Sequence, residues 1–195
     1  MRSDAPALMP IFRSTHQADL LTLLLLHPDS DYTATELADR LDVPVTTLHR
    51  EINRLEAAGL ITSRPVGRSR LLRANTASRL TRPLTDLLLA TFGPRPVVEE
   101  EFSPLDADVV LIFGSWAARY RGAPGPPPND VDVLLVGDVD RDDAYDAAQR
   151  SESRLGFPVN TTIVSVDRWN AVADPLIRTI KTSPVITVVE SAHAA

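Results

Sequence analysis

Two apolar segments in the second half of the chain, ADVVLIF (107–113) and VDVLLVG (131–137), restrict the possible folds most strongly. Each is a short run of Val, Leu and Ile followed by or ending at Gly, which is typical of a strand buried inside a sheet. The segment DDAYDAAQRSESRLG, which comes after the second run, has the pattern of a helix. We therefore predict a small mixed-sheet α/β domain over residues 105–195.

The second predicted strand carries two acidic residues, Asp130 and Asp132. Strand side chains alternate, so both carboxylates point to the same face, about 6.7 Å apart along the strand. Two such carboxylates repel each other unless a positive charge lies beside them. Mg²⁺ bound with a nucleoside triphosphate would supply that charge, because it prefers one or two carboxylates plus phosphate oxygens. An ion pair between Asp132 and Arg119 is the structural alternative.

A Gly-Ser turn, Gly114-Ser115, separates the first strand from a short predicted helix, WAARYRG, which contains Arg119. Glycine lets the backbone approach a ligand closely, and free N–H groups at the start of a helix attract phosphate. Gly-Ser, a short helix and then Asp-x-Asp on the next strand resemble the DNA polymerase β-like nucleotidyltransferases over about residues 105–190. The resemblance implies that Asp130 and Asp132 are catalytic and bind metal, and that Gly114, Ser115 and Arg119 bind nucleotide.

The chain departs from that family at two positions. Asn129 replaces the usual Ser before the first Asp. On the later strand GFPVNTTIVS, Asn160 occupies the position of the third catalytic carboxylate, and a neutral amide cannot act as a base. The nearest acid, Asp167, lies beyond that strand, where we expect it to cap a helix. We therefore expect a site that binds metal and nucleotide but transfers nucleotide poorly.

The first half of the chain has the pattern of a helix-turn-helix. QADLLTLLLLH is apolar on nearly all sides, as in a buried helix, and TATELADRLDV and PVTTLHREINRLEAAGL form two amphipathic helices joined by a short turn. In the last of these, Val45, Leu48, Ile52 and Leu55 form one apolar stripe. The opposite side carries residue types that contact base edges and phosphates, namely Thr46, Thr47, His49, Arg50 and Asn53.

The following segment, LITSRPVGRSRLLRAN, predicts a β-hairpin, or wing. Arginines suit the phosphate backbone or a narrow minor groove, and the hairpin contains Arg64, Arg68, Arg70 and Arg73. Residues 17–76 resemble the winged-helix domains of ArsR-type bacterial repressors through TATELADRL, TTLHREINRLEAAGLI and GRSRLLRAN, in that order. A winged helix used for protein contacts is the alternative. The chain has no cysteine, so sensing of metals through thiolates is not implied.

The organisation that follows is an α+β protein with a winged helix-turn-helix over residues 1–76, a helical connector over 77–104 and the nucleotidyltransferase-like domain over 105–195. Residues 1–76 contain nine Arg and nine acidic residues, so the whole net charge of −6 lies in the rest of the chain. In the connector, SRLTRPLTDLLLATFG predicts an amphipathic helix with Leu80, Leu84, Leu87, Leu88 and Phe92 on its apolar side, and we place the boundary between domains near residues 93–96.

These features favour a DNA-binding transcriptional regulator that acts on double-stranded DNA as a homodimer and carries a nucleotide-binding module. The alternatives are an active Mg²⁺-dependent nucleotidyltransferase that modifies RNA, protein or a small molecule, and an antitoxin-like partner of a separate toxin. The absence of cysteine fits a reducing cytoplasm. No apolar run reaches the roughly 20 residues of a membrane span, and the N-terminus lacks a signal-peptide core, so we expect a cytoplasmic protein without a membrane partner.

Overall fold

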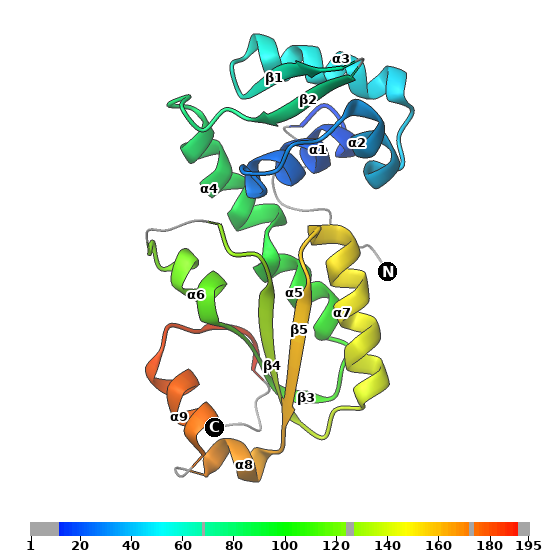
Figure 1. The fold of residues 1–195 in the computed structure, drawn as a ribbon. Coiled ribbons are helices and arrows are strands. Elements are labelled where there is room, and N and C mark those ends of the chain that lie inside the picture. The colour runs from blue at the N-terminus through cyan, green and yellow to red at the C-terminus, as the bar shows by residue number, and fades with distance from the viewer. Residues whose placement is uncertain (1–11, 68, 124–126, 172–173, 191–195) are drawn as a thin grey trace. The chain divides into compact units, whose positions relative to one another are not determined.

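The computed structural model describes residues 12–67, 69–123, 127–171 and 174–190 of the chain (Figure 1). The chain divides into two compact units, Met1–Gly93 and Pro94–Ala195. The architecture is mixed α and β, with a winged helix-turn-helix in the first unit. Among the described residues, the helices are all too short or too polar to cross a membrane.

The first unit consists of three helices, a hairpin and a fourth helix. Ser14 caps the first helix, and Thr33 caps the second through a capping box in which the Glu36 carboxylate accepts a hydrogen bond from the Thr33 backbone N–H. The elements are α1 (Thr15–Leu26), α2 (Ala34–Leu41), α3 (Val45–Ala57), β1 (Ile61–Val66), β2 (Ser69–Ala74) and α4 (Thr81–Phe92). Local capping chemistry thus defines where α1 and α2 begin.

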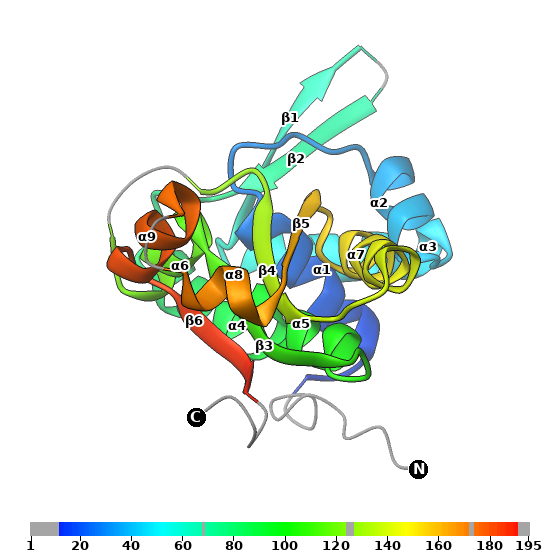
Figure 2. The same ribbon diagram turned by 90° about the horizontal axis from the view of Figure 1, so that it is seen from below.

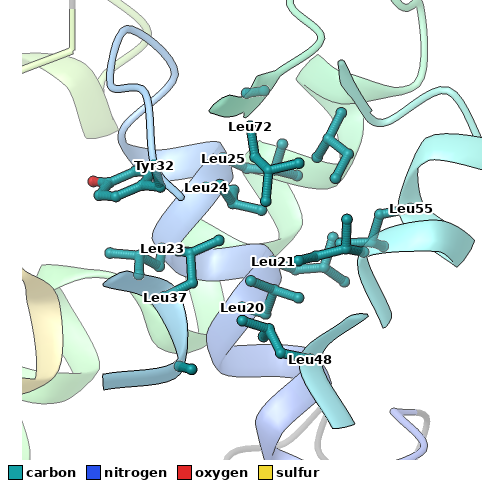
Figure 3. Close-up of a cluster of buried hydrophobic side chains, with 14 of the residues drawn as sticks. Leu20, Leu21, Leu23, Leu24, Leu25, Tyr32, Leu37, Leu48, Leu55 and Leu72 are labelled. Carbon is teal, nitrogen blue, oxygen red and sulfur yellow. The ribbon is translucent and has the colours of Figure 1, made fainter. Parts of the chain in front are cut away.

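Helix α1 is the centre of the first hydrophobic core. Its leucines meet side chains from α2, α3 and β2, as the close-up shows (Figure 3). This explains why the α1 sequence is apolar on nearly all sides, because a helix that other elements surround has no side exposed to solvent. In α3, Leu48, Ile52 and Leu55 are buried as predicted, but Val45 is exposed because it lies in the first turn of the helix, next to the Pro44 cap.

The turn between α2 and α3 contains a left-handed residue that is not glycine. Asp42 has φ 50° and ψ 48°, and its N–H donates to the carbonyl of Ala38. We expect Asp42→Gly to stabilise the first unit by about 0.5–1 kcal/mol. This is the roughly 1–2 kcal/mol cost of the left-handed conformation less the extra backbone entropy of glycine.

Urea denaturation followed by circular dichroism measures this effect. Asp39→Gly is the matched control, because Asp39 is exposed within α2, where glycine should cost about 1 kcal/mol. Opposite shifts of the two variants are expected. An Asp42→Gly protein that is no more stable than the natural sequence would contradict the assignment of strain to this turn.

The residues expected to form a connector are divided between the two units. Helix α4 contributes Leu88 to the core of the first unit, whereas α5 (Pro94–Phe102) belongs to the second. The predicted apolar side of α4 was partly wrong: Leu80 and Leu87 are 54% and 42% exposed, whereas Leu89 is buried. Leu80 precedes α4 as its N-cap. At 100° per residue, Leu87 and Leu89 point about 100° to opposite sides of Leu88, and Leu89 lies on the side of the buried Thr81.

The second unit is built on a four-stranded mixed sheet of order β5-β4-β3-β6. β3 is antiparallel to both β4 and β6, and β4 is parallel to β5. The elements are β3 (Ala107–Phe113), α6 (Gly114–Tyr120), β4 (Val131–Gly137), α7 (Arg141–Leu155), β5 (Val159–Val164), α8 (Val166–Asn170), α9 (Pro175–Thr182) and β6 (Ile186–Glu190). The two apolar runs of the sequence are therefore the two central strands.

Helices cover both faces of this sheet, with α5 and α7 on one face and α8 and α9 on the other (Figure 2). On the second face, Val109 and Leu111 of β3 pair in register with Val136 and Leu134 of β4. These four side chains pack with Ile177 and Ile180 of α9 in one core cluster. Asp132 pairs with Phe113 in the same register and so continues this face at the end of the core.

Candidate functional site

The acidic pair of β4 lies beside Asn160 of β5. Asp132 and Asn160 are register partners in the parallel ladder, so their side chains leave the sheet on the same face. The Asn160 amide nitrogen donates to Asp130 Oδ2 at 2.9 Å and to Asp132 Oδ1 at 3.4 Å. The three side chains that the sequence singled out as a potential catalytic set therefore meet at one place.

The surroundings of Asp132 disfavour its charged form. Partial burial, and to a smaller extent the charge of Asp130, raise the pKa of Asp132 above the ordinary aspartate value, although the hydrogen bond from Asn160 acts in the opposite direction. Among the described residues, Asp132 thus accepts a hydrogen bond from Asn160. This replaces the ion pair with Arg119 that was the alternative from the sequence. A bound cation would act in the same sense as Asn160 by favouring the charged carboxylate.

The Gly-Ser turn borders the acidic pair directly. Gly114 has φ +71°, and a Cβ added there would lie 2.7 Å from Asp132 Oδ2. Only glycine therefore fits this position without displacing the carboxylate. Ser115 follows in an exposed position at the start of α6, whereas Arg119 is half-buried in the last turn of that helix. Asp167 lies in the first turn of α8, but Ser165, not Asp167, caps that helix.

The donor set suits Mg²⁺ held jointly with a phosphate ligand. Two carboxylates and one amide offer oxygen ligands, and Mg²⁺ typically takes one or two carboxylates and completes its shell with water and phosphate oxygens. Among the described residues, no group of three or more His, Cys, Asp or Glu side chains is arranged to hold a metal ion. A cation at Asp130 and Asp132 would therefore depend on the ligand that it shares.

The predicted base-contacting residues lie on the outer side of α3. Thr46, His49, Arg50 and Asn53 are exposed and Thr47 is half-buried. Arg50 makes no ion pair among the described residues, unlike Arg54 on the same helix, which pairs with Glu51. The helix thus presents uncommitted hydrogen-bonding groups opposite its buried stripe.

The wing is the hairpin of β1 and β2, with Val66 pairing with Ser69 at its end. Three of its predicted DNA-contacting arginines are paired within the unit: Arg64 and Arg73 with Asp31 at 3.0 and 3.2 Å, and Arg70 with Glu56 at 2.6 Å. Arg68 lies outside the described residues. The sequence predicted DNA-contacting arginines in the wing; those that the structure describes are partly exposed and paired with acids.

Comparison with known proteins identifies the first unit. A family described as a helix-turn-helix domain matches residues 12–64. The first unit contains a winged helix-turn-helix domain. The matched region ends within β1, and the hairpin that completes the wing follows directly.

Solved structures similar to the chain include three of low identity. Reduced HlyU from Vibrio cholerae is 20% identical with a TM-score of 0.35, over 43% of this chain and 82% of that chain. The homodimeric winged helix-turn-helix domain of Mb0332 from Mycobacterium bovis, a possible ArsR-family regulator, is 16% identical with a TM-score of 0.31, over 53% and 94%. A toxin-antitoxin with AMP-PNP is 15% identical with a TM-score of 0.32, over 50% and 71%. No curated protein matches the sequence.

The sequence patterns missed two residues of the winged domain, Asp31 and Glu56. Neither belongs to a recognisable motif. The signal that could have indicated them is the charge balance of residues 1–76, in which nine acidic residues offset nine arginines. Such a balance indicates that some acids pair with the arginines, and two of them, Asp31 and Glu56, lie against the wing.

Proposed function

We propose that this protein is a transcriptional regulator that binds double-stranded DNA through its winged helix-turn-helix. In this proposal, the second unit is a nucleotidyltransferase-like module that binds a divalent cation with a nucleoside triphosphate. The observation that carries the proposal is the exposed polar side of α3, opposite a stripe that the core buries. A recognition helix needs this combination, because one side must anchor it while the other reaches base edges in the major groove.

Within the second unit, we assign cation binding to Asp130 and Asp132. Bound Mg²⁺ would neutralise phosphate charge and orient the nucleotide. Gly114 leaves room beside Asp132 that any side chain would fill. Asn160 supports the two carboxylates through its amide N–H but cannot accept the proton of an attacking hydroxyl, so we assign it a positioning role. Transfer is accordingly slow or absent.

An active nucleotidyltransferase is the second candidate, and the convergence of Asp130 and Asp132 beside the Gly-Ser turn favours it. It differs from the first candidate in one measurable respect. Incubation with labelled nucleoside triphosphates, Mg²⁺ or Mn²⁺ and candidate acceptors gives a labelled product only if the protein is an enzyme. The antitoxin-like role stays a prediction, whose test is co-purification with the product of a neighbouring small reading frame.

Selection of genomic DNA fragments by the purified protein tests the proposed function. We expect a recovered motif with two half-sites related by a palindrome and spaced by about 10 base pairs or a multiple, because a homodimer places two recognition helices in successive major grooves. The selected duplex should bind at least ~1,000-fold more tightly than random duplex at the same salt concentration. Equal affinity for selected and random DNA would remove the regulator from consideration.

A further inference from the structure

The arginines of the wing lie on opposite faces of the hairpin. In the antiparallel register, Arg64 pairs with Leu71 and Arg73 pairs with Thr62, whereas Arg70 pairs with Pro65. Directly paired residues share a face and successive residues alternate. Arg64 and Arg73 therefore share one face and Arg70 lies on the other. Each face has its own acid, Asp31 for the first and Glu56 for the second.

Asp31 is held over its face by the backbone. The next residue, Tyr32, exchanges two backbone hydrogen bonds with Leu72 of β2, at 3.0 and 2.8 Å. The two carboxylate oxygens of Asp31 are divided between Arg64 and Arg73, and Arg73 also donates to the Asp29 carbonyl at 2.6 Å. Hydrogen bonding from Arg64 lowers the pKa of Asp31, so the carboxylate is charged at neutral pH.

Glu56 holds the arginine of the other face. One Arg70 nitrogen donates to both oxygens of Glu56, at 2.6 and 2.7 Å, and to Ser63 Oγ at 2.7 Å. Glu56 lies near the end of α3, so this contact also connects the recognition helix to the wing. All three arginine side chains nevertheless stay between 45% and 60% exposed. Their guanidinium groups are thus accessible to phosphate, but the carboxylates of Asp31 and Glu56 neutralise their charge.

We propose that Asp31 and Glu56 are specificity-determining residues. They keep the wing arginines from contacting phosphates until α3 has made its base contacts. The inference rests on the proposed DNA-binding function. Phosphate contacts supply essentially all non-specific affinity, whereas base contacts discriminate. An acid that occupies an arginine must be displaced before that arginine reaches a phosphate. Base contacts on a cognate duplex offset the free-energy cost of breaking the ion pair. On random DNA nothing offsets that cost, so affinity for random DNA is lower.

The strength of these pairs is compatible with release. Exposed ion pairs contribute about 0–1 kcal/mol, which is less than the 1–3 kcal/mol of one good bidentate base contact. The base contacts of a cognate duplex therefore exceed the cost of displacing Asp31 or Glu56, whereas on random DNA that cost is subtracted from phosphate contacts alone. A cleft lined by Asp31, Thr62, Arg64, Leu71 and Arg73 gives access to the first of these pairs.

The test compares Asp31→Asn, Glu56→Gln and the control Asp39→Asn in the full chain, on the selected motif and on random duplex between 50 and 200 mM salt. Each arginine released to a phosphate should steepen the log–log salt slope by about 0.9, or about 3.5-fold in affinity across that range. On random duplex we expect increases of up to about 1.8 for Asp31→Asn and about 0.9 for Glu56→Gln, and smaller increases on the motif, where the natural protein already releases these arginines. Asp39→Asn removes the same charge from an exposed residue that makes no ion pair among the described residues, and it should leave the slope unchanged.

Random-duplex affinity should rise more than motif affinity, so the ratio between them should fall in both acid variants. Adding Arg64→Ala to Asp31→Asn should return the slope toward that of the natural protein. Unchanged slopes, or weaker binding to both duplexes, in folded acid variants would overturn the inference, since weaker binding would mean that the acids position the arginines for DNA. If the natural protein itself prefers no motif, the proposed function fails, which is a distinguishable result.

Discussion

We expect the double variant Asp130→Asn/Asp132→Asn to lose more than about 100-fold in Mg²⁺-dependent affinity for nucleoside triphosphate. Mutations of residues that merely orient metal ligands already cost about 10- to 100-fold, and here both carboxylates disappear while shape is kept. Isothermal titration with each nucleoside triphosphate, with and without Mg²⁺, measures the loss.

The matched control is Asp138→Asn/Asp146→Asn, which removes two exposed carboxylates from the same unit. It should bind as the natural protein does. If the natural protein binds no metal and no nucleotide under any of these conditions, Asp130 and Asp132 are not a cation site. If the natural protein transfers label efficiently and Asp130→Asn abolishes that transfer, an active nucleotidyltransferase becomes the primary function.

Asn160→Asp tests the same site from the opposite direction. The Asn160 amide nitrogen is 2.9 Å from Asp130 Oδ2, so a carboxylate in its place adds a third negative charge within contact distance. The metal-free variant should therefore melt at a lower temperature than the natural protein, and Mn²⁺ or Mg²⁺ with nucleotide should raise its melting temperature more. Labelled transfer should also rise, because the variant gains a proton acceptor. A metal-free melting temperature above that of the natural protein would contradict the arrangement of this cluster.

The pH dependence of stability follows from the raised pKa of Asp132. The folded protein takes up a proton at higher pH than the unfolded chain does, so the charged carboxylate lowers stability at neutral pH. This cost declines as the pH falls through the folded pKa and is gone below the ordinary aspartate value. Asp132→Asn should therefore be more stable than the natural protein at pH 7, by a margin that shrinks in acid. Tryptophan fluorescence reports this unit selectively, because both tryptophans, Trp116 and Trp169, lie in it.

The second large effect is expected at the recognition helix. Arg50→Ala should weaken binding to the selected motif by about 1–3 kcal/mol, which is roughly 5- to 150-fold, and should relax the base preference at one position of each half-site. The reason is that Arg50 is exposed on the outer side of α3 and makes no ion pair among the described residues. Competition binding with a set of single-base variants of the motif measures both quantities.

Arg54→Ala is the control for this prediction, since Arg54 is an exposed arginine on the same helix that pairs with Glu51. It should lower affinity by a similar factor for all duplexes, or not at all, without changing the base preference. His49→Ala and Asn53→Ala should shift preference at other positions of the motif. If the preference of every α3 variant stays that of the natural protein, α3 does not read the bases.

Much of the molecule was predictable because it depends on local chemistry. Ser14 and the capping box of Thr33 and Glu36 define helix starts through hydrogen bonds that span three residues. The convergence of Asp130, Asp132 and Asn160 was also within reach, because strand side chains alternate with a period of two. One correct assumption about which strands are neighbours then places these residues on a single face.

What only the tertiary structure decided is which charged groups meet. Arg64 and Asp31 are 33 residues apart in the chain and Arg70 and Glu56 are 14 apart, and neither pair follows a helical or strand period. Their meeting depends on the bridge between Tyr32 and Leu72 and on the packing that brings the end of α3 beside the hairpin. Which side of α4 faces inward depends on packing in the same way, since Leu88 joins the core cluster that the leucines of α1 occupy. Local patterns encode where an element begins and which face is apolar, but the partner of an exposed charge is chosen by the distances that packing creates.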